Sequence, residues 1–364
     1  MNIINENMPK FFPLEVKSVD KATEDCTVVS FEVPEQFQKN FQFLPGQHLT
    51  LKKMIGKEDV RRSYSLCSSP LENQWKVAVK QIPDGLFSTY INHELQAGDK
   101  IEVMPPSGLF GVKPDEKAKK HYVFFAAGSG ITPILSMIKT HLATESNSKC
   151  QLFYLNKNAK SIIFKEEIEQ IRNKYFGRFE IFYFLTREQR DIELFNGRFT
   201  PEKIKQLSET ILNIENTDEC FICGPEQMIF MIHDELVKYG LPKEHIHYEL
   251  FVSGLSEADK QRVEKARQKR KGNTEITILD GGKEFHFDMS KDDDNILDAA
   301  LVAGADLPFA CKGGVCSTCK CKLIEGEVEM KVNYALEKSE VAQNYVLSCQ
   351  SIPTTKKVIV DFDV

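Results

Sequence analysis

Four cysteines in the last quarter of the chain have the spacing of iron–sulfur ligands. Three lie in one loop, Cys311-Lys-Gly-Gly-Val-Cys316-Ser-Thr-Cys319, and the fourth follows at Cys349. A C-x4-C-x2-C loop with a distant fourth cysteine is the pattern of a [2Fe-2S] cluster, in which four thiolates hold two irons. Gly313 and Gly314 allow the loop to wrap closely and turn N–H groups toward the sulfurs. We therefore predict metal ligation by Cys311, Cys316, Cys319 and Cys349.

Other interpretations of the cysteines fit the sequence less well. A structural zinc site usually has two separated Cys/His pairs rather than three cysteines in one loop. Disulfides belong to secreted proteins, and residues 1–16 lack the cationic start and apolar core of a secretion signal. We expect a cytoplasmic protein with reduced thiols. The remaining thiols are expected to be small core side chains at Cys26, Cys67, Cys150, Cys220 and Cys321.

The whole chain has the composition of a globular protein with two to three domains. It has 364 residues, of which 41% are hydrophobic and 27% charged, and its net charge is −6. An acidic chain is a poor match for nucleic acid, which needs a basic surface. The apolar stretch Tyr122–Ile138 is interrupted by Gly128-Ser129-Gly130 and Thr132-Pro133, so we expect a strand, a turn and a helix rather than a membrane span.

Residues 14–112 have the pattern of an antiparallel β-barrel. Short apolar or alternating runs such as Thr27–Val33, His48–Leu51 and Lys100–Val103 are separated by Pro, Gly and Asp. The barrel region contains Arg62-Ser-Tyr64-Ser65 and then Gly85-Leu-Phe-Ser88. An arginine can neutralise a diphosphate, a tyrosine can stack on a planar ring, and the N-terminus of a helix can take phosphates. Either motif alone is also compatible with a surface cation and a barrel-filling ring.

Residues 118–250 alternate between predicted strands and helices, which indicates a parallel sheet whose ligands lie at the carboxyl ends of its strands. A helix is expected at Pro201–Asn213. The turn Gly128-Ser-Gly130-Ile-Thr132-Pro follows the first strand, and Cys223-Gly224-Pro225 ends another. Glycines at such turns allow a diphosphate to approach the helix N-terminus. Taken alone, these motifs also fit a tight turn and a buried strand thiol.

The end of the third strand bears on the coenzyme. Thr186 and Arg187 stand there, and Arg198 follows. A 2′-phosphate needs cations and hydroxyls, whereas a free ribose diol is usually met by an acidic residue. The pattern favours NADPH, while the adjacent Glu188 leaves NADH possible. Arg187 is also compatible with a solvated loop charge.

The last third of the chain divides by charge. Residues 253–272 hold seven Lys or Arg against three acids, which predicts a charged linker. Residues 273–364 hold nine lysines against sixteen acids, a net charge of −7. A hairpin is expected around Gly281-Gly282, a helix at Asn295–Ala303, and a strand at Val346–Gln350 that carries Cys349.

Together these motifs resemble the ferredoxin–NADP reductase family joined to a C-terminal plant-type ferredoxin. The resemblance implies an FAD-binding antiparallel β-barrel (1–114), an NAD(P)H-binding α/β domain with a parallel sheet (115–252), a linker (253–272) and an α+β, β-grasp-like [2Fe-2S] domain (273–364). It also implies residue roles. FAD would be bound by Arg62, Tyr64, Ser65, Gly85, Ser88 and Phe251. NAD(P)H would be bound by Gly128, Gly130, Thr132, Thr186, Arg187, Arg198, Cys223, Gly224 and Pro225. The catalytic residues would be Ser65, Cys223 and Glu249, although Glu249 is also compatible with a structural strand residue.

The order of modules is similar to that of reductase components of multicomponent monooxygenases, in particular the subgroup that serves phenylacetyl-CoA epoxidation. The segments whose sequence is most similar to this subgroup are Phe309–Cys316, Glu327–Met330, Asn333–Leu336 and Tyr345–Gln350. The resemblance implies an enzyme that passes electrons from NADPH to FAD, to the cluster and to an oxygenase component, which docks on the acidic ferredoxin domain. Two alternatives remain open: a general reductase of a soluble carrier, a hybrid-cluster protein or another oxygenase or desaturase, and a non-enzymatic redox sensor.

Overall fold

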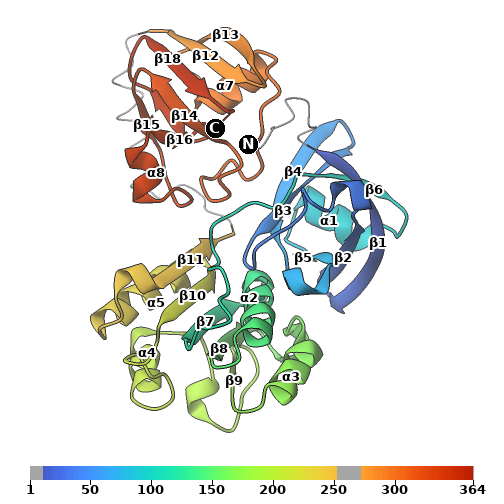
Figure 1. The fold of residues 1–364 in the computed structure, drawn as a ribbon, viewed down its shortest axis with the longest axis vertical. Coiled ribbons are helices and arrows are strands. Elements are labelled where there is room, and N and C mark those ends of the chain that lie inside the picture. Colours follow the sequence, from blue (N-terminus) through green and yellow to red (C-terminus); the bar gives the residue numbers. More distant parts are fainter. Residues whose placement is uncertain (1–10, 252–271, 364) are drawn as a thin grey trace. The chain divides into compact units, whose positions relative to one another are not determined.

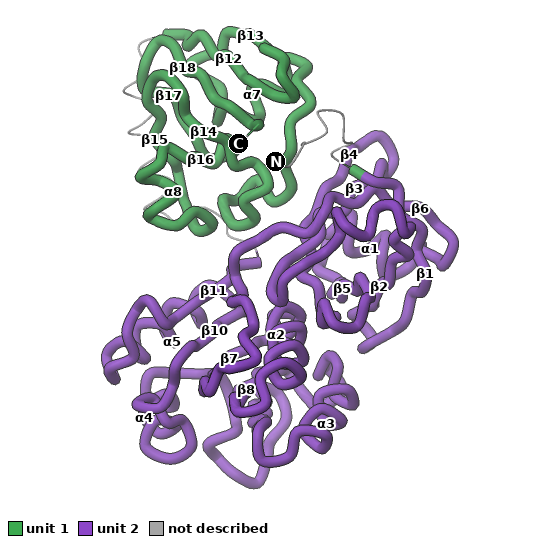
Figure 2. The backbone as a smooth tube through the Cα atoms, in the orientation of Figure 1, with its two compact units in different colours: residues 1–11, 252–364 green, residues 12–251 purple. Residues whose placement is uncertain are grey.

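The structure, a computed structural model, describes residues 11–251 and 272–363 of the chain. Residues 12–251 form one compact unit, and the described part of 252–364 belongs to the other (Figure 2). The predicted boundary at 114–115 therefore lies inside the larger unit. The predicted charged linker, 253–272, lies outside the described residues except for Gly272.

The first half of the larger unit is a six-stranded antiparallel barrel (Figure 1). Its strand order is β4-β3-β6-β1-β2-β5, and a bridge between Leu66 and Val77 joins β4 to β5 and closes the barrel. Side chains alternate between core and solvent, as in β1, where Leu14 is buried and Glu15 exposed. Helix α1 packs its apolar face into the same core. The elements are β1 (Phe12–Thr23), β2 (Cys26–Glu32), β3 (His48–Ile55), β4 (Glu58–Ser65), β5 (Trp75–Lys80), α1 (Leu86–His93) and β6 (Lys100–Val103).

The second half is a parallel sheet of order β11-β10-β7-β8-β9. The central strand β7 is almost completely buried because helices cover both faces, α2 and α3 on one side and α4 and α5 on the other (Figure 1). The strands are β7 (His121–Ala127), β8 (Lys149–Asn156), β9 (Phe179–Leu185), β10 (Glu219–Gly224) and β11 (Ile246–Leu250). The helices are α2 (Ile131–Thr144), α3 (Lys165–Lys174), α4 (Pro201–Ser208) and α5 (Glu226–Lys238).

Tyr122–Ile138 forms the strand, turn and helix that its glycines predict, and no helix in the described ranges is long and apolar enough to cross a bilayer. The predicted helix at 201–213 is shorter than expected. Its start follows its capping residues, since the Thr200 hydroxyl accepts the Lys203 N–H at 3.2 Å. It ends at Ser208, and the chain then turns so that the Leu207 carbonyl accepts from the N–H groups of Thr210, Ile211 and Leu212.

The smaller unit has a mixed sheet of order β13-β12-β18-β14-β16 and a short pair, β15-β17. The predicted hairpin around Gly281-Gly282 is present, and Asn295 caps α7 by accepting the Asp298 N–H at 2.8 Å. The predicted strand at Val346–Gln350 is wrong at its end. Strand β16 stops at Leu347, and Cys349 lies in a turn closed by a Gln350 N–H to Leu347 carbonyl bond of 2.8 Å. The elements are β12 (Thr274–Asp280), β13 (Lys283–Met289), α7 (Ile296–Val302), β14 (Lys320–Glu325), β15 (Val328–Met330), α8 (Lys338–Ala342), β16 (Tyr345–Leu347), β17 (Ser351–Pro353) and β18 (Lys357–Asp361).

Candidate active site and iron–sulfur site

The N-terminus of α1 is an open backbone cradle. Gly85 occupies the N-cap position, and no described side chain caps the first turn, so its N–H groups are available to an anion. A Cβ at Gly85 would collide with Ile82 Cγ1 and the Ser88 hydroxyl. That hydroxyl is used within the turn: it donates to the Gly85 carbonyl at 3.2 Å and accepts from the Ile82 N–H at 3.3 Å. Ser88 therefore shapes the cradle, and the backbone is the part that fits a diphosphate.

Strand β4 carries the other predicted flavin residues. Arg62 is exposed and Tyr64 half-buried, with its ring centroid 6.0 Å from that of Phe87 in α1. The two β4 side chains share one face because they are two positions apart. The neighbouring Arg61 is buried instead, and its Nη2 lies 2.8 Å from Asp59 Oδ2. Ion pairing of Arg61 leaves Arg62 as the exposed guanidinium on the Tyr64 face.

The last residue of β4 meets the parallel sheet. The Ser65 hydroxyl donates to Glu249 Oε2 at 3.1 Å across 184 positions of sequence. Glu249 lies on β11, in register with Cys223 on β10. Cys223 is fully buried, and burial, together with the Glu249 charge, raises the pKa of its thiol well above the usual value. Cys223 can therefore pack against a ring but is a poor nucleophile. The structure brings the three predicted catalytic residues into one junction.

Two glycine turns meet at the carboxyl edge of the parallel sheet. One follows β7 and opens α2, and the other follows β10 and opens α5. A Cβ on Gly130 would collide with the Cys223 carbonyl, and one on Gly224 would lie 2.6 Å from Met228 Cε. Neither position accepts a larger residue without movement. The close approach of the turns makes one continuous edge.

The remaining residues of this edge differ in exposure. Gly128 has a φ of +53° and open space where a Cβ would project. Thr132 is buried, and its hydroxyl donates to the Ser129 carbonyl at 3.0 Å. Pro225 is the N-cap of α5, one position before the first helical residue. Phe251, two residues after Glu249, is half-buried against the core formed by the sheet and α2. Its predicted position over the flavin remains a prediction.

Beyond β9 the chain turns outward with its predicted cations. The Thr186 N–H donates to the Asn156 carbonyl at 3.0 Å, so the ends of β8 and β9 stay joined. The side chains of Arg187 and Arg198 are exposed. Exposed guanidinium groups at this edge are accessible to an incoming phosphate.

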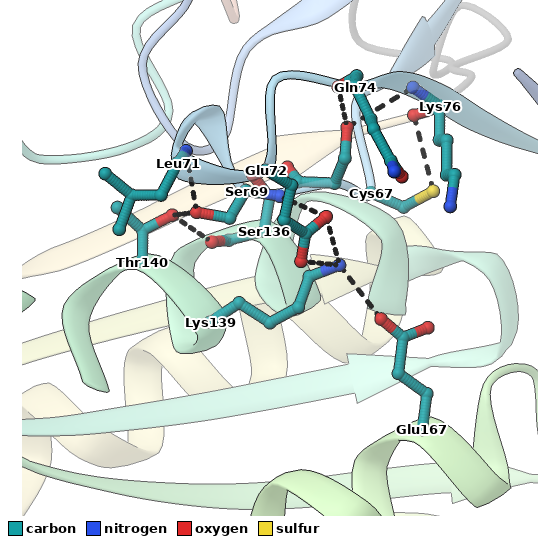
Figure 3. A network of polar contacts seen from close by, with 11 residues as sticks. Cys67, Ser69, Leu71, Glu72, Gln74, Lys76, Ser136, Lys139, Thr140 and Glu167 are labelled. Carbon is teal, nitrogen blue, oxygen red and sulfur yellow. Dashed lines mark hydrogen bonds and ion pairs between the residues drawn. The ribbon is translucent and has the colours of Figure 1, made fainter. Parts of the chain in front are cut away.

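A polar seam joins the barrel to α2, and no motif in the sequence indicates it (Figure 3). The seam consists of Ser68, Ser69 and Glu72 from the barrel and Ser136, Lys139 and Thr140 from α2. Ser136 Oγ donates to the Ser68 carbonyl at 2.6 Å. The Ser69 and Thr140 hydroxyls lie 2.8 Å apart and are buried.

Lys139 is the charged member of the seam. Its Nζ lies 3.1 Å from Glu72 of the barrel and 2.9 Å from Glu167 of α3, and its side chain is 11% exposed. The barrel part of the seam begins at Ser68, three residues after Ser65. The other part lies on α2, which starts just after Gly130. The seam therefore holds β4 and the turn that opens α2 at a defined separation.

The four predicted cluster ligands come together as two pairs. The thiol of Cys311 interacts with that of Cys316, and the thiol of Cys319 with that of Cys349. A [2Fe-2S] cluster takes two protein ligands at each iron, so the donor set fits this group. Within the described residues no three His, Cys, Asp or Glu side chains surround a single-ion position.

The cluster loop is held by a residue that the spacing argument missed. Gln350 Nε2 donates to the Lys312 carbonyl at 2.8 Å and lies 3.3 Å from Cys349 Sγ. It ties the fourth ligand to the three-cysteine loop, and a donor to a ligand sulfur tunes the cluster. The Gly313 N–H also donates to Cys311 Sγ, at 3.3 Å. A Cβ on Gly314 would lie 3.0 Å from Val332 Cγ2, which accounts for a glycine there.

The other five cysteines are buried and unpaired, as predicted for core side chains. Burial raises the pKa of each thiol, which keeps it protonated. These residues are Cys26, Cys67, Cys150, Cys220 and Cys321.

Three family models match successive parts of the chain. An oxidoreductase FAD-binding domain matches residues 13–111, an oxidoreductase NAD-binding domain matches residues 124–234, and a 2Fe-2S iron-sulfur cluster binding domain matches residues 278–354. These ranges correspond to the barrel, the parallel sheet and the cluster unit. The chain is therefore an oxidoreductase that uses FAD, a nicotinamide nucleotide and a [2Fe-2S] cluster.

Full-length relatives and a solved structure share this order of domains. The chain is 41% identical over 356 residues to a 1,2-phenylacetyl-CoA epoxidase subunit of Escherichia coli (strain K12), covering 98% of this chain and 99% of that one. It is 32% identical to the ferredoxin reductase component of 3-ketosteroid-9-alpha-monooxygenase of Rhodococcus rhodochrous, covering 96% of each chain. The fold also resembles phthalate dioxygenase reductase, with a TM-score of 0.57, 22% identity and coverage of 97% of this chain and 98% of that one. The chain belongs to the family of ferredoxin–NADP reductase-type oxidoreductases that join an FAD-binding, an NAD-binding and a C-terminal [2Fe-2S] domain in one polypeptide, the family that includes this epoxidase component.

Proposed function

We propose that this chain transfers electrons from NADPH, through FAD and its [2Fe-2S] cluster, to the oxygenase component of a phenylacetyl-CoA epoxidase. The observation that carries electron entry is the Ser65–Glu249 contact, which joins the flavin strand to the nucleotide edge within one compact unit. The choice of acceptor rests on the 41% identity along almost the whole of both chains.

The residues of the larger unit divide the work of binding and alignment. When bound, FAD accepts the hydride of the nicotinamide, and the cluster receives electrons singly. The α1 cradle and Arg62 hold the diphosphate, and Tyr64 packs against the ring. The glycine turns at Gly128–Gly130 and Cys223–Pro225 seat the nucleotide so that its nicotinamide lies at the junction. The protein thereby supplies position and polarity, and the bound groups supply the redox chemistry.

Ser65 has a defined proton arrangement at this junction. Because its hydroxyl hydrogen is donated to Glu249 Oε2, the lone pairs of Ser65 Oγ remain available as acceptors. With FAD bound, Ser65 Oγ would be able to accept a hydrogen bond from an N–H of the flavin ring. Glu249 would hold the Ser65 hydroxyl in this orientation and could take up a proton through it.

NADPH is the proposed coenzyme because of the charges at the end of β9. Arg187 and Arg198 are exposed, and Thr186 directly precedes Arg187 in the sequence. The competing acid, Glu188, has its Oε2 occupied by the Ala159 N–H at 2.8 Å. The exposed guanidinium groups of Arg187 and Arg198 are groups at this edge that could pair with a 2′-phosphate.

The cluster unit is the proposed docking surface for the oxygenase. Nine lysines against sixteen acids make residues 273–364 the most acidic part of the chain. Such a surface steers association toward a basic partner, and salt screens the attraction.

All ten cysteines are unpaired, which supports a cytoplasmic location where thiols stay reduced.

The proposal is tested by mixing the pure protein with a phenylacetyl-CoA epoxidase oxygenase complex. NADPH and NADH consumption are compared with and without phenylacetyl-CoA, epoxide is quantified, and salt is varied. We expect substrate-dependent NADPH consumption with matching product, which declines as salt rises. A salt-independent rate removes the docking surface from the proposal. Equal rates with NADH remove the coenzyme preference.

A second acceptor has support from the relatives. The 3-ketosteroid-9-alpha-monooxygenase component is 32% identical over 96% of both chains, so a reductase of this architecture can serve other oxygenases. If the chain reduces cytochrome c but leaves the epoxidase unreduced, the reductase chemistry stands and the acceptor is another oxygenase or carrier.

A further inference from the structure

Asn156, the last residue of β8, has a buried side chain with no hydrogen bond. It is 6% exposed, and neither its Oδ1 nor its Nδ2 has a partner among the described residues. An amide removed from water without replacement partners costs free energy. A buried asparagine with both atoms unpaired within the chain calls for a partner from outside it, either an ordered water or a ligand group.

The same chain satisfies another buried asparagine completely. Asn92 of α1 is 7% exposed. Its Oδ1 accepts from Thr27 Oγ1 at 2.8 Å and from Lys21 Nζ at 3.2 Å. Its Nδ2 donates to the carbonyls of Val79 at 3.0 Å and Ser88 at 2.9 Å. The unsatisfied amide of Asn156 lies at the carboxyl edge of the sheet, where ligands are expected. The satisfied amide of Asn92 has a structural role.

Strand register locates Asn156 between two parts of the nucleotide edge. Leu155 pairs with Ala127 of β7, so Asn156 is level with Gly128. On its other side, its carbonyl accepts the Thr186 N–H. Its side chain lies on the same face of β8 as that of Tyr154.

Tyr154 does not satisfy the amide. The Tyr154 hydroxyl donates its hydrogen to the Gly128 carbonyl at 3.0 Å, so toward the Asn156 side chain it can act only as an acceptor of a hydrogen bond from Nδ2. No bond of acceptable geometry results within the described part of the chain. The amide thus lies unpaired beneath the turn that opens α2.

We propose that Asn156 binds a hydroxyl of the adenosine ribose of NADPH. An amide with donor and acceptor both unpaired calls for a group that is itself donor and acceptor, as a ribose hydroxyl is; phosphate oxygens only accept. The backbone bond to Thr186 places Asn156 on the side of the residues proposed for the 2′-phosphate, which is attached to that ribose. This inference rests on the proposed nucleotide site.

The test compares stability and nucleotide affinity in the FAD- and cluster-loaded full chain. In Asn156→Leu the unpaired amide is replaced by an apolar side chain of similar size. We expect the nucleotide-free variant to unfold at the same or a higher temperature than the wild type, because a desolvation cost is removed. We expect its Kd for 2′,5′-ADP, measured by calorimetry, to rise about tenfold, since one ribose hydroxyl loses its partners. The Kd for nicotinamide mononucleotide should stay unchanged.

Gln151→Leu is the matched control on the same strand. Gln151 is also buried, with an unpaired Oε1, but it lies near the opposite end of β8 and its Nε2 donates to Glu180 and to the Ile211 carbonyl. Its replacement should lower the unfolding temperature and leave both affinities unchanged. Asn156→Ala serves as a second variant if leucine disturbs packing, and its expected affinity change is the same.

Three results overturn the inference. One is an Asn156 variant that binds 2′,5′-ADP as the wild type does, which would mean that water serves the amide. Another is weakened binding of nicotinamide mononucleotide alone. The third is failure of the wild type to bind any adenosine nucleotide, which would remove the proposed function as well. A wild type that binds 5′-ADP but not 2′,5′-ADP removes only the NADPH preference, and the Kd comparison with 5′-ADP then decides the role of Asn156.

Discussion

The junction at Ser65 and Glu249 and the cysteine site at Cys311–Cys349 are built in opposite ways. The junction joins residues 184 positions apart, from a barrel and a parallel sheet. The cysteine site takes three of its four ligands from a single loop, and one turn supplies the fourth. The first depends on how two modules pack, whereas the second depends on the local course of one loop. Damage to one site should therefore leave the other intact.

The largest effect is expected at the cysteine site. Replacing Cys349 by serine removes a ligand that no neighbouring thiol can supply, because Cys321 is buried on β14 with its Sγ 3.8 Å from the Val346 carbonyl. We expect the cluster absorbance and cytochrome c reduction to be lost, while NADPH still reduces ferricyanide through the flavin. Cys321→Ser should keep the cluster. A Cys349→Ser protein with full cluster absorbance would remove Cys349 from the ligand set.

The next effect belongs to the junction. Ser65→Ala removes the proposed acceptor, and the loss of such a hydrogen bond is worth about 1–3 kcal/mol, or roughly 5- to 150-fold in rate. Stopped-flow flavin reduction by NADPH should slow by this factor while the cluster spectrum stays unchanged. Glu249→Gln should have a smaller effect in the same direction, because an amide can still accept the Ser65 hydrogen. Ser63→Ala is the control, since its hydroxyl faces Thr50 at 3.1 Å and lies away from the junction. Unchanged reduction rates in Ser65→Ala and Glu249→Gln would exclude both residues from the reaction.

The seam gives a smaller effect on the same site. Lys139→Met leaves Glu72 and Glu167 without their shared cation, and these carboxylates are partly exposed, so we expect a loss of about 1–2 kcal/mol of unfolding free energy. Flavin reduction should slow a few-fold because the two modules are less well aligned. Lys205→Met is a control, since its pair with Glu209 is exposed and 3.8 Å long. A normal reduction rate despite lower stability would restrict the seam to a structural role.

The last prediction concerns the stability of the larger unit at low pH, not electron transfer. Burial lowers the pKa of His48 to about 4, below its value of about 6.5 in an unfolded chain. The folded protein therefore holds His48 neutral, and its stability falls as pH drops from 6.5 toward 4, by at most about 1.4 kcal/mol per pH unit. Urea unfolding followed by Trp75 fluorescence should show this slope, and His48→Gln should reduce it. Equal slopes in both proteins would show that another group titrates.

The sequence predicted the features that local chemistry determines. Features that depend on a few adjacent residues were predicted: the cysteine loop, the glycine turns at Gly128 and Gly224, and the β12–β13 hairpin. The structure contains each of them. The position of Cys349 in a turn was missed because β16 and the turn share one apolar run. Helix α4 was predicted too long because its end depends on a turn after Leu207 rather than on a breaker residue.

Contacts between residues far apart in the chain could not be predicted from the sequence, because they depend on how separate elements pack. Ser69, Thr140 and Lys139 are ordinary surface residue types, and only packing of the barrel on α2 buries them. Asn156 likewise has no motif, because its significance lies in bonds that are not formed. Ser65 and Glu249 were proposed through family resemblance, and their contact needed the fold. Gln350 was missed because a residue next to a ligand cysteine has no characteristic type.

The most direct test of the two-site account is anaerobic rapid mixing of NADPH with the full chain. Flavin bleaching is followed optically and cluster reduction by electron paramagnetic resonance, in the wild type, Ser65→Ala and Cys349→Ser. We expect flavin bleaching before cluster reduction in the wild type, delay of both in Ser65→Ala, and normal flavin bleaching without a cluster signal in Cys349→Ser. Cluster reduction that precedes flavin bleaching, or flavin bleaching lost in Cys349→Ser, would contradict this expectation.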